Sequence, residues 1–228
     1  MSDARARWAR VLLFVIPALW SSNYLIARLS VDVIGPHTLA FGRWALAGLI
    51  LLPFVWRGLA RDPSVWRREG RQLLVLGGLG MGICGAWVYI AGRTTTSTNI
   101  ALIYSVTPVT IAMASAWLLH ERMRAAQRLG VAAAFGGMLF IIAKGDLVHL
   151  LDVRFAPGDL WIVGCAAAWT AYSVLLRRWP STLGTAERLV AIIAGGLVVL
   201  APFTLAEWWI EPQPPLGARA IGLVLLGA

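Results

Sequence analysis

Charged residues are scarce in this chain of 228 residues, and acidic residues are the scarcer kind. Only 14% of the residues are charged, whereas 59% are hydrophobic, and Asp and Glu together number 11. A soluble domain typically has about 25% charged residues, which cover its surface. The composition therefore excludes an ordinary soluble domain before any motif is considered.

Cysteine and histidine are also few. Cys84 and Cys165 fall singly in different apolar stretches, so neither a disulfide framework nor a metal site is indicated. His37, His120 and His149 are scattered along the chain without metal-ligand spacing. A GxxxxGK[ST] phosphate-binding loop is also missing. We therefore expect no bound metal, no cofactor and no direct use of ATP.

The chain does contain a series of apolar stretches, most of them close to the ~20 residues that a helix needs to cross ~30 Å of hydrocarbon. Seven are complete: Val11–Leu29, Pro36–Trp56, Gln72–Gly92, Thr98–Leu119, Leu129–Ala143, Asp159–Leu176 and Ala186–Ala206. An eighth begins at Arg219. A buried helix of a globular core is an alternative for the short fifth stretch, but not for seven stretches in series. The pattern predicts an all-α polytopic membrane protein in a lipid bilayer.

The first stretch could instead belong to a signal peptide, because arginines precede its apolar run. No clear small-residue cleavage site follows, and the hydrophobic character resumes through Tyr24, Leu25 and Ile26 after a short polar interruption. We interpret this stretch as the first transmembrane helix.

The formal net charge of +9 raises the question of a nucleic-acid partner, which the placement of the basic residues answers. Most of them precede the first stretch or follow the second, fourth and sixth: Arg5, Arg7, Arg10, Arg57, Arg61, Arg67, Arg68, Arg71, Arg122, Arg124, Arg128, Arg177, Arg178 and Arg188. The other loops hold only Arg93, Lys144, Arg154 and Arg219, together with several acids. By the positive-inside rule the N-terminus is cytoplasmic, in a multi-pass protein of the cell (inner) membrane, and no nucleic-acid partner is expected.

The sequence also carries a weak internal repeat. An offset of 149 residues pairs Trp20 with Trp169, Arg28 with Arg177, Pro53 with Pro202, and 74–76 with 223–225. Five spans separate each pair, an odd number, so the two copies would cross the membrane in opposite directions. Apolar helices can resemble one another by chance, but one offset serves three separate stretches without a gap.

Several motifs resemble EamA-type transporters of the drug/metabolite transporter (DMT) superfamily. They are Trp20–Arg28 (WSSNYLIAR), Thr38–Ala47 (TLAFGRWALA), Asn99–Pro108 (NIALIYSVTP), Leu118–Arg122 (LLHER), and Gly158–Leu160 followed by Ala168–Tyr172. The resemblance implies ten spans in two inverted five-helix repeats. Residues 1–144 would then form the first repeat, and residues 158–228 an incomplete second repeat of two helices and the start of a third. The chain would be truncated in its eighth span.

Arg43 is the most informative single residue, because it lies roughly 10 Å inside the second span at 1.5 Å per residue. No acid in the same span can pair with it. An intramembrane arginine costs at least ~2.5 kcal/mol unless it faces a cavity, a partner or the interface, which makes it a functional candidate. The alternative is that it reaches outward to the interface or binds backbone carbonyls.

Acidic residues are missing from the interiors of the spans, and the nearest are Asp159, Glu187 and Glu207 at span edges. Proton-coupled export of lipophilic cations, as in the small multidrug-resistance proteins of the same superfamily, relies on a membrane carboxylate. A positive centre with polar and aromatic neighbours suits a carboxylate-bearing solute, such as an amino acid, better.

Further candidates to line a substrate path are the polar and aromatic residues that interrupt the spans. Beside Arg43 they are Trp20, Asn23, Tyr24, Tyr89, Asn99, Tyr104, Trp169 and Tyr172. Each of them alone could equally serve helix packing or mark the membrane interface. Trp20 and Trp169 have an additional argument, because the repeat places them at equivalent depths of the two halves.

These observations favour a secondary transporter, an exporter of small metabolites such as amino acids, that works by alternating access. The alternative is a non-transporting membrane scaffold or an intramembrane enzyme. Intramembrane catalysis needs a set such as a serine with a histidine, or paired acids, and the spans lack a buried histidine or acid to activate their hydroxyls. We therefore expect no enzyme activity, and the oligomeric state is open.

Overall fold

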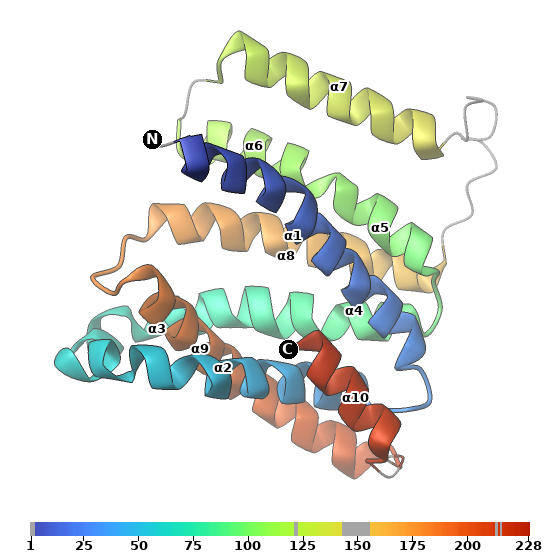
Figure 1. Cartoon of the computed structure of the whole chain (residues 1–228). Coiled ribbons are helices and arrows are strands. Elements are labelled where there is room, and N and C mark those ends of the chain that lie inside the picture. Colours follow the sequence, from blue (N-terminus) through green and yellow to red (C-terminus); the bar gives the residue numbers. More distant parts are fainter. Residues whose placement is uncertain (1–2, 121–122, 143–155, 213, 215) are drawn as a thin grey trace.

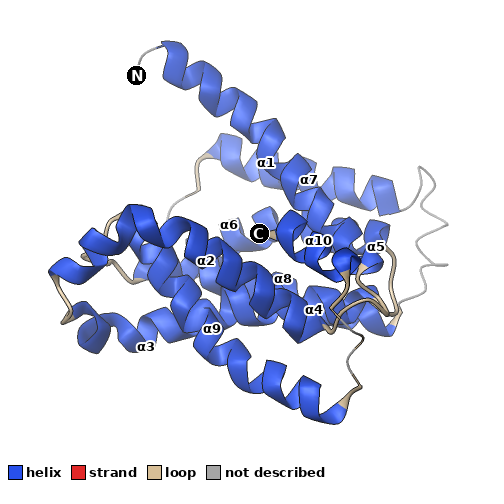
Figure 2. Ribbon diagram, turned by 60° about the horizontal axis from the view of Figure 1, so that its bottom comes forward, coloured by secondary structure: helices blue, strands red, loops and turns tan. Residues whose placement is uncertain are grey.

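Every regular element that the structure describes is a helix. The computed structural model describes residues 3–120, 123–142, 156–212, 214 and 216–228, and no strand occurs in these ranges. Figure 2 accordingly shows only helices and loops there. The prediction of an all-α fold is confirmed for this part of the chain. Glu121 and Arg122 of the resemblance lie outside the described residues.

The helices follow the apolar stretches in order. Their bounds are α1 Asp3–Leu29, α2 Pro36–Arg61, α3 Val65–Gly77, η1 Gly78–Ile83, α4 Cys84–Gly92, α5 Ser97–Ser105, α6 Thr107–Leu118, α7 Ala125–Ile142, α8 Pro157–Arg178, α9 Thr185–Ile210 and α10 Ala218–Gly227. The η1 segment is a π-helix. Because α3, η1 and α4 follow one another without a gap, they form one continuous rod (Figure 1).

Five of these helical stretches are long and apolar enough to cross a membrane. They are Pro36–Arg61, Val65–Gly92, Ser97–Leu118, Pro157–Arg178 and Thr185–Ile210, counted over the described residues. Each corresponds to one predicted span. Most of these helices extend past the predicted ends of the apolar stretches. Polar and basic residues that flank the membrane-spanning segment continue the helix beyond it.

Proline sets two of the helix boundaries. Gly35 has an extended backbone and Pro36 follows at the first helical position of α2, where its missing N–H costs no hydrogen bond. The fourth predicted span is interrupted at Val106, and Pro108 lies at the start of α6. Proline lacks the N–H that would continue the hydrogen bonding of the helix, which accounts for the break between α5 and α6.

Helices α2 and α9 run antiparallel along each other (Figures 1 and 2). The start of α2 meets the end of α9, where the Thr38 amide donates to the Glu207 carboxylate at 2.9 Å. The rod α3–η1 packs on the same helix through glycines. A Cβ added to Gly77 would lie 2.2 Å from the Gly196 amide nitrogen, so only glycine permits this approach.

The start of the rod is anchored by an acid that the sequence interpretation had left outside the spans. Glu69 of α3 is buried, and its carboxylate accepts hydrogen bonds from Ser181 and from the amide and hydroxyl of Thr182, both at 3.1 Å. Arg188 donates to the Leu176 carbonyl at 3.1 Å across the same turn. These bonds fix the α8–α9 connection against α3.

Between α2 and α3 the chain makes a short exposed turn. The Ser64 hydroxyl and the Arg68 guanidinium donate to the Asp62 carboxylate, and the Ser64 amide does so at 3.1 Å. These bonds hold the pKa of Asp62 below its ordinary value, the Ser64 hydroxyl bond being the largest cause. A charged carboxylate therefore closes this connection.

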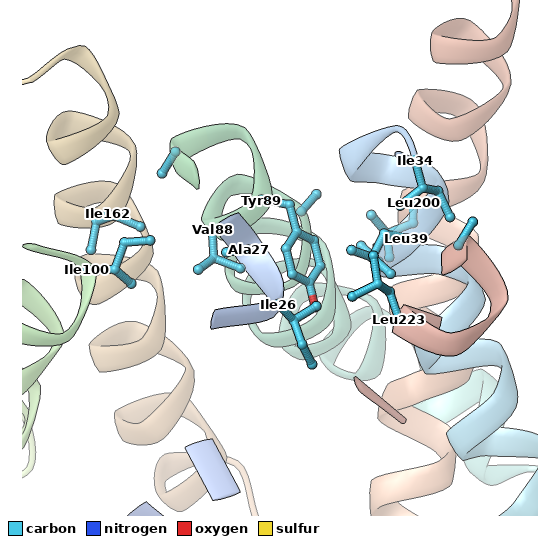
Figure 3. Packing of buried hydrophobic residues seen from close by; sticks show 14 residues of the cluster. Ile26, Ala27, Ile34, Leu39, Val88, Tyr89, Ile100, Ile162, Leu200 and Leu223 are labelled. Atoms are coloured by element: carbon cyan, nitrogen blue, oxygen red, sulfur yellow. The ribbon is translucent and has the colours of Figure 1, made fainter. Parts of the chain in front are cut away.

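Helix α4 is central, in contact with α1, α2 and α8, whereas α7 lies at one edge beside α5 and α6 (Figure 1). The main buried cluster is built around α4 and includes Ile26, Leu39, Val88 and Tyr89. In Figure 3 the Tyr89 ring lies between residues of α1 on one side and Leu39 and Leu223 on the other. This cluster positions the polar group described next.

Candidate functional site

Arg43 of α2 reaches across to α1 and α4. One terminal nitrogen of its guanidinium donates to the Asn23 side-chain oxygen at 2.6 Å and to the Tyr89 hydroxyl. The Tyr89 hydroxyl in turn donates to the same Asn23 oxygen at 2.8 Å. Three helices therefore contribute to one polar group in the interior of the helix bundle.

The guanidinium also contacts aromatic faces. Its central carbon lies 4.7 Å from the ring centroid of Trp44 and 5.8 Å from that of Tyr89. Such cation–π contacts stabilise a desolvated cation by about 2 kcal/mol. Within the part of the chain that the structure describes, no carboxylate lies at ion-pair distance from Arg43. The cation is held by neutral partners.

Two donors beside this group have no acceptor. The Arg43 Nε and the Trp44 Nε1 are both buried and lack a hydrogen-bond partner among the described residues. A buried unsatisfied donor costs about 1–3 kcal/mol, and hydrogen-bonding capacity left unused at such a place is typical of a site that receives an acceptor. The arrangement can therefore accommodate an anionic or strongly hydrogen-bond-accepting group at Arg43.

A single turn of α1 links this group to two sets of aromatic rings. Trp20, Asn23 and Tyr24 are three and four residues apart and so lie on one face of the helix. The Tyr24 ring stacks on Tyr104 of α5 with centroids 5.5 Å apart. Trp20 contacts Trp169 of α8 edge-on at 5.4 Å.

The second aromatic set continues along α8, where the Trp169 ring stacks on Tyr172 at 5.0 Å. Trp20 itself is half exposed, with 51% of its surface accessible, so this set borders on open space. Eight of the nine residues predicted from the sequence thus lie in three groups of contacts that meet on α1. They are Trp20, Asn23, Tyr24, Arg43, Tyr89, Tyr104, Trp169 and Tyr172.

Asn99, the ninth, lies in a different group at the start of α5. Its side-chain amide is 3.4 Å from both carboxylate oxygens of Asp159, which begins α8. The Thr95 hydroxyl donates to the same carboxylate, and the Ala156 amide does so at 2.8 Å. In the structure Asn99 joins the α4–α5 connection to the start of α8.

The sequence interpretation missed two features of the site. Trp44 was not singled out, because adjacent residues of a helix do not face each other and the sequence gives no signal that its ring flanks the guanidinium. The other is a carboxylate at the start of α2, where Glu207 of α9 accepts from the amides of His37 and Thr38 at 3.0 and 2.9 Å. This contact depends on the packing of two distant helices, so no local signal could have revealed it.

Metal chemistry finds little support in the arrangement around Arg43. The described residues contain no group of three or more His, Cys, Asp or Glu side chains that could hold a metal ion. What the site offers is a cation, hydroxyl and amide groups, and aromatic surface. These groups can bind and orient a solute, and none of them is an evident nucleophile paired with a base.

Comparison with known proteins gives a consistent result. The EamA-like transporter family matches residues 7–143. The uncharacterized transporter YyaM of Bacillus subtilis is 26% identical over 85% of this chain and 65% of its own length. A probable biotin transporter of Pseudomonas aeruginosa is 29% identical over 95% of the chain and 73% of its own length.

The S-adenosylmethionine/S-adenosylhomocysteine transporter of Chlamydia muridarum is 23% identical over 94% of the chain and 70% of its own length. The chain spans about two thirds of the length of the curated relatives it matches. No solved structure matches it.

Proposed function

Because this chain belongs to the EamA-like transporter family, we propose that it is a secondary transporter that exports small metabolites, such as amino acids, across the cytoplasmic membrane. Its five apolar helical stretches agree with a multi-pass membrane protein. Substrate would bind near the middle of the bundle and be released on alternate sides, with the N-terminus in the cytoplasm. The proposed site comprises the nine residues named above, including Asn99.

The observation that carries this proposal is the half-buried Arg43, which has no ion-pair partner among the described residues. Its neutral neighbours Asn23 and Tyr89 fix the guanidinium, while its Nε is left without an acceptor. A carboxylate of the substrate would supply both the missing charge and the missing acceptor. Biotin and S-adenosylmethionine, which the names of two relatives mention, both carry a carboxylate.

The helix bounds support the proposed inverted repeat. Helices α2 and α9 are both 26 residues long, and their first residues, Pro36 and Thr185, differ by the same 149 positions as the repeated residues. Trp20 and Trp169, which are equivalent in the repeat, contact each other. Equivalent residues can touch only near the axis that relates two copies, so this contact agrees with a substrate site between residues 1–144 and 158–228.

The test is transport in proteoliposomes. Uptake and efflux of labelled amino acids and other carboxylated solutes would be measured for this chain and for a version extended to ten spans, each also as Arg43→Ala. We expect transport by the extended protein and its loss in Arg43→Ala. A wild-type protein that moves none of these solutes under any gradient would contradict the proposal.

A second variant, Arg43→Lys, separates an effect on substrate binding from an effect on folding. Arg43→Lys keeps the positive charge but lacks the planar guanidinium that can present two donors to one carboxylate. We expect it to retain the monodisperse elution of the wild type and to raise the KM by about 10-fold or more, as for loss of a charged hydrogen bond. Equal transport by wild type and Arg43→Lys would exclude bidentate recognition.

A further inference from the structure

Two cysteines that are 81 positions apart in the sequence face each other where α4 meets α8. The Cys84 thiol donates to the Cys165 carbonyl at 3.2 Å, and the Cys165 thiol approaches the Ile83 carbonyl at 3.7 Å. Each sulfur therefore lies against the backbone of the other cysteine's helix. Both thiols are free, Cys165 being buried and Cys84 partly accessible.

The local fold explains this juxtaposition. Ile83 is the last residue of the π-helical segment η1, which adds a residue to the turn and so rotates the following α4 relative to α3. Short π-helical segments of this kind occur often at functional sites. Close packing of α4 on α8 is completed by Trp87, whose ring contacts Trp161 edge-on at 5.0 Å.

The cysteine pair is next to one residue of the proposed substrate site, Tyr104. Tyr104 is a close neighbour of both thiols. The ring of the same residue stacks on Tyr24 at 5.5 Å. The sulfur atoms are thus one side chain away from the aromatic surface of α1, although neither cysteine belongs to it.

We propose that Cys84 and Cys165 form a two-thiolate site for a soft divalent metal cation. Thiolates select soft cations. On binding, each S–H bond breaks and releases its proton to solvent, two sulfur–metal bonds form, and no electron is transferred. A divalent cation with two thiolates is neutral overall, which suits the membrane interior, where net charge is costly.

The donor set also defines what the site excludes. A structural zinc site needs four ligands in a tetrahedron. No third His, Cys, Asp or Glu joins these two cysteines in the described residues. The pair therefore suits a cation that accepts two-coordinate, nearly linear sulfur ligation, and mercuric ion is the appropriate probe. This inference is independent of whether the protein transports carboxylates.

The experiment measures metal retention by the purified full chain in detergent. Wild type, Cys84→Ser, Cys165→Ser and Tyr104→Phe would be loaded with mercuric ion, challenged with excess glutathione, separated by gel filtration and assayed for mercury. A second thiol held on the same protein acts at a high effective concentration, so a bridged ion resists a monothiol competitor. Tyr104→Phe is the matched control: it changes a residue beside the thiols but keeps both of them.

We expect wild type and Tyr104→Phe to retain one ion per chain, and each serine variant to lose at least about 90% of it, since only the bridged ion resists the competitor. The mercuric ion should also raise the unfolding temperature of the wild type but of neither serine variant. Unchanged unfolding temperatures of the metal-free variants would show that they fold.

Retention by a single-cysteine variant equal to that of the wild type would overturn the proposal, because one thiol would then suffice. Retention of two ions per wild-type chain would overturn it as well, because the thiols would bind separately. Retention of zinc ion to the same degree would contradict the two-coordinate assignment.

Discussion

Tyr89 determines how the guanidinium of Arg43 is presented. The residue is 2% exposed, and its hydroxyl lies between Arg43 and Asn23, donating to the latter at 2.8 Å. A residue so enclosed by the protein is better suited to orient Arg43 than to contact a solute. The nine predicted residues thus divide into those that border open space, such as Trp20, and those that support them.

Tyr89→Phe tests this role, because it removes only the hydroxyl group. The ring packing is kept, while Asn23 and Arg43 each lose a hydrogen-bond partner. We expect the free energy of unfolding to fall by about 1–2 kcal/mol, as for loss of a buried hydrogen bond. The KM for a carboxylated solute should rise while the protein stays monodisperse.

Thermal unfolding in detergent and transport in proteoliposomes would be measured side by side. Trp209→Phe is the control, because Trp209 is 89% exposed and should leave both values unchanged. A Tyr89→Phe protein with wild-type stability and wild-type KM would show that the hydroxyl does not hold Arg43.

Glu207 matters for stability through the start of α2. Its carboxylate accepts from two backbone amides, His37 and Thr38, and from the Thr38 hydroxyl at 2.8 Å. The first amides of a helix have no partner within the helix, so this side chain of α9 takes the place of a capping residue. Gly35, at the position where a capping side chain would stand, cannot supply one.

Glu207→Ala should therefore lower the free energy of unfolding by about 1–2 kcal/mol, because two part-buried amides lose their acceptor. Glu207→Gln retains an acceptor oxygen and should lose less. Glu211→Ala is the matched control, since the Arg93–Glu211 pair at 3.1 Å is exposed and contributes at most about 1 kcal/mol. Equal destabilisation by Glu207→Ala and Glu211→Ala would contradict the capping role.

At the scale of elements, α3 and α9 approach each other very closely at Gly77. The backbone of Gly77 lies so near α9 that an added Cβ would be 2.5 Å from the Ile192 carbonyl oxygen. Backbone atoms cannot move aside as a flexible side chain can. Any larger residue at position 77 must therefore push the two helices apart.

Gly77→Ala is expected to lower the unfolding temperature by roughly 5–10 °C, as for an overpacked contact in a chain of this size. Gly70→Ala is the control within the same helix, because a Cβ there meets nothing within 4 Å. That control should be neutral or slightly stabilising, since alanine favours a helix over glycine. Destabilisation of both variants to the same extent would show that the close approach is not responsible.

Hydrophobic length predicted the helices well but not their internal irregularities. The break before Pro108 could be foreseen, because proline removes a backbone hydrogen bond. The π-helical segment Gly78–Ile83 could not, because glycines permit it without requiring it. Contacts between helices that are distant in sequence, such as Cys84 with Cys165, depend on how each helix is rotated about its own axis. The pattern of apolar residues does not predict that rotation.

The candidate site, like the fold, could be predicted from the sequence only in part. Arg43 could be recognised from its cost in a membrane, and the polar interruptions of α1 from their contrast with the surrounding apolar residues. That Asn23 and Tyr89 bind Arg43, whereas Asn99 binds Asp159, follows only from the packing of the helices. Residue type indicates a polar role, and tertiary structure decides which partner fulfils it.

For the whole molecule, the distribution of arginines predicts the orientation in the membrane. Single cysteines introduced at Pro63 or Pro180, in a chain lacking Cys84 and Cys165, should react with an impermeant maleimide only from the cytoplasmic side. Cysteines at Asp32 or Thr94 should react only from the other side. The reason is the positive-inside rule, because arginines flank the first pair of positions.

Labelling would be compared in intact cells and in inside-out vesicles. Each variant carries one reactive thiol, so the two pairs of positions serve as controls for each other. The reverse pattern, or labelling of all four positions from one side, would contradict the predicted orientation.

The edge-on contact between Trp20 and Trp169 has a mechanical consequence. Under the proposed repeat, these equivalent rings lie close to the axis that relates the two halves. In alternating access the two halves exchange conformations, so a point on the axis that relates them has the same surroundings in both states. The indole pair would then act as a pivot. The ends of α1 and α8 would be displaced in each transport cycle, whereas the two rings would stay in contact and change only their relative orientation.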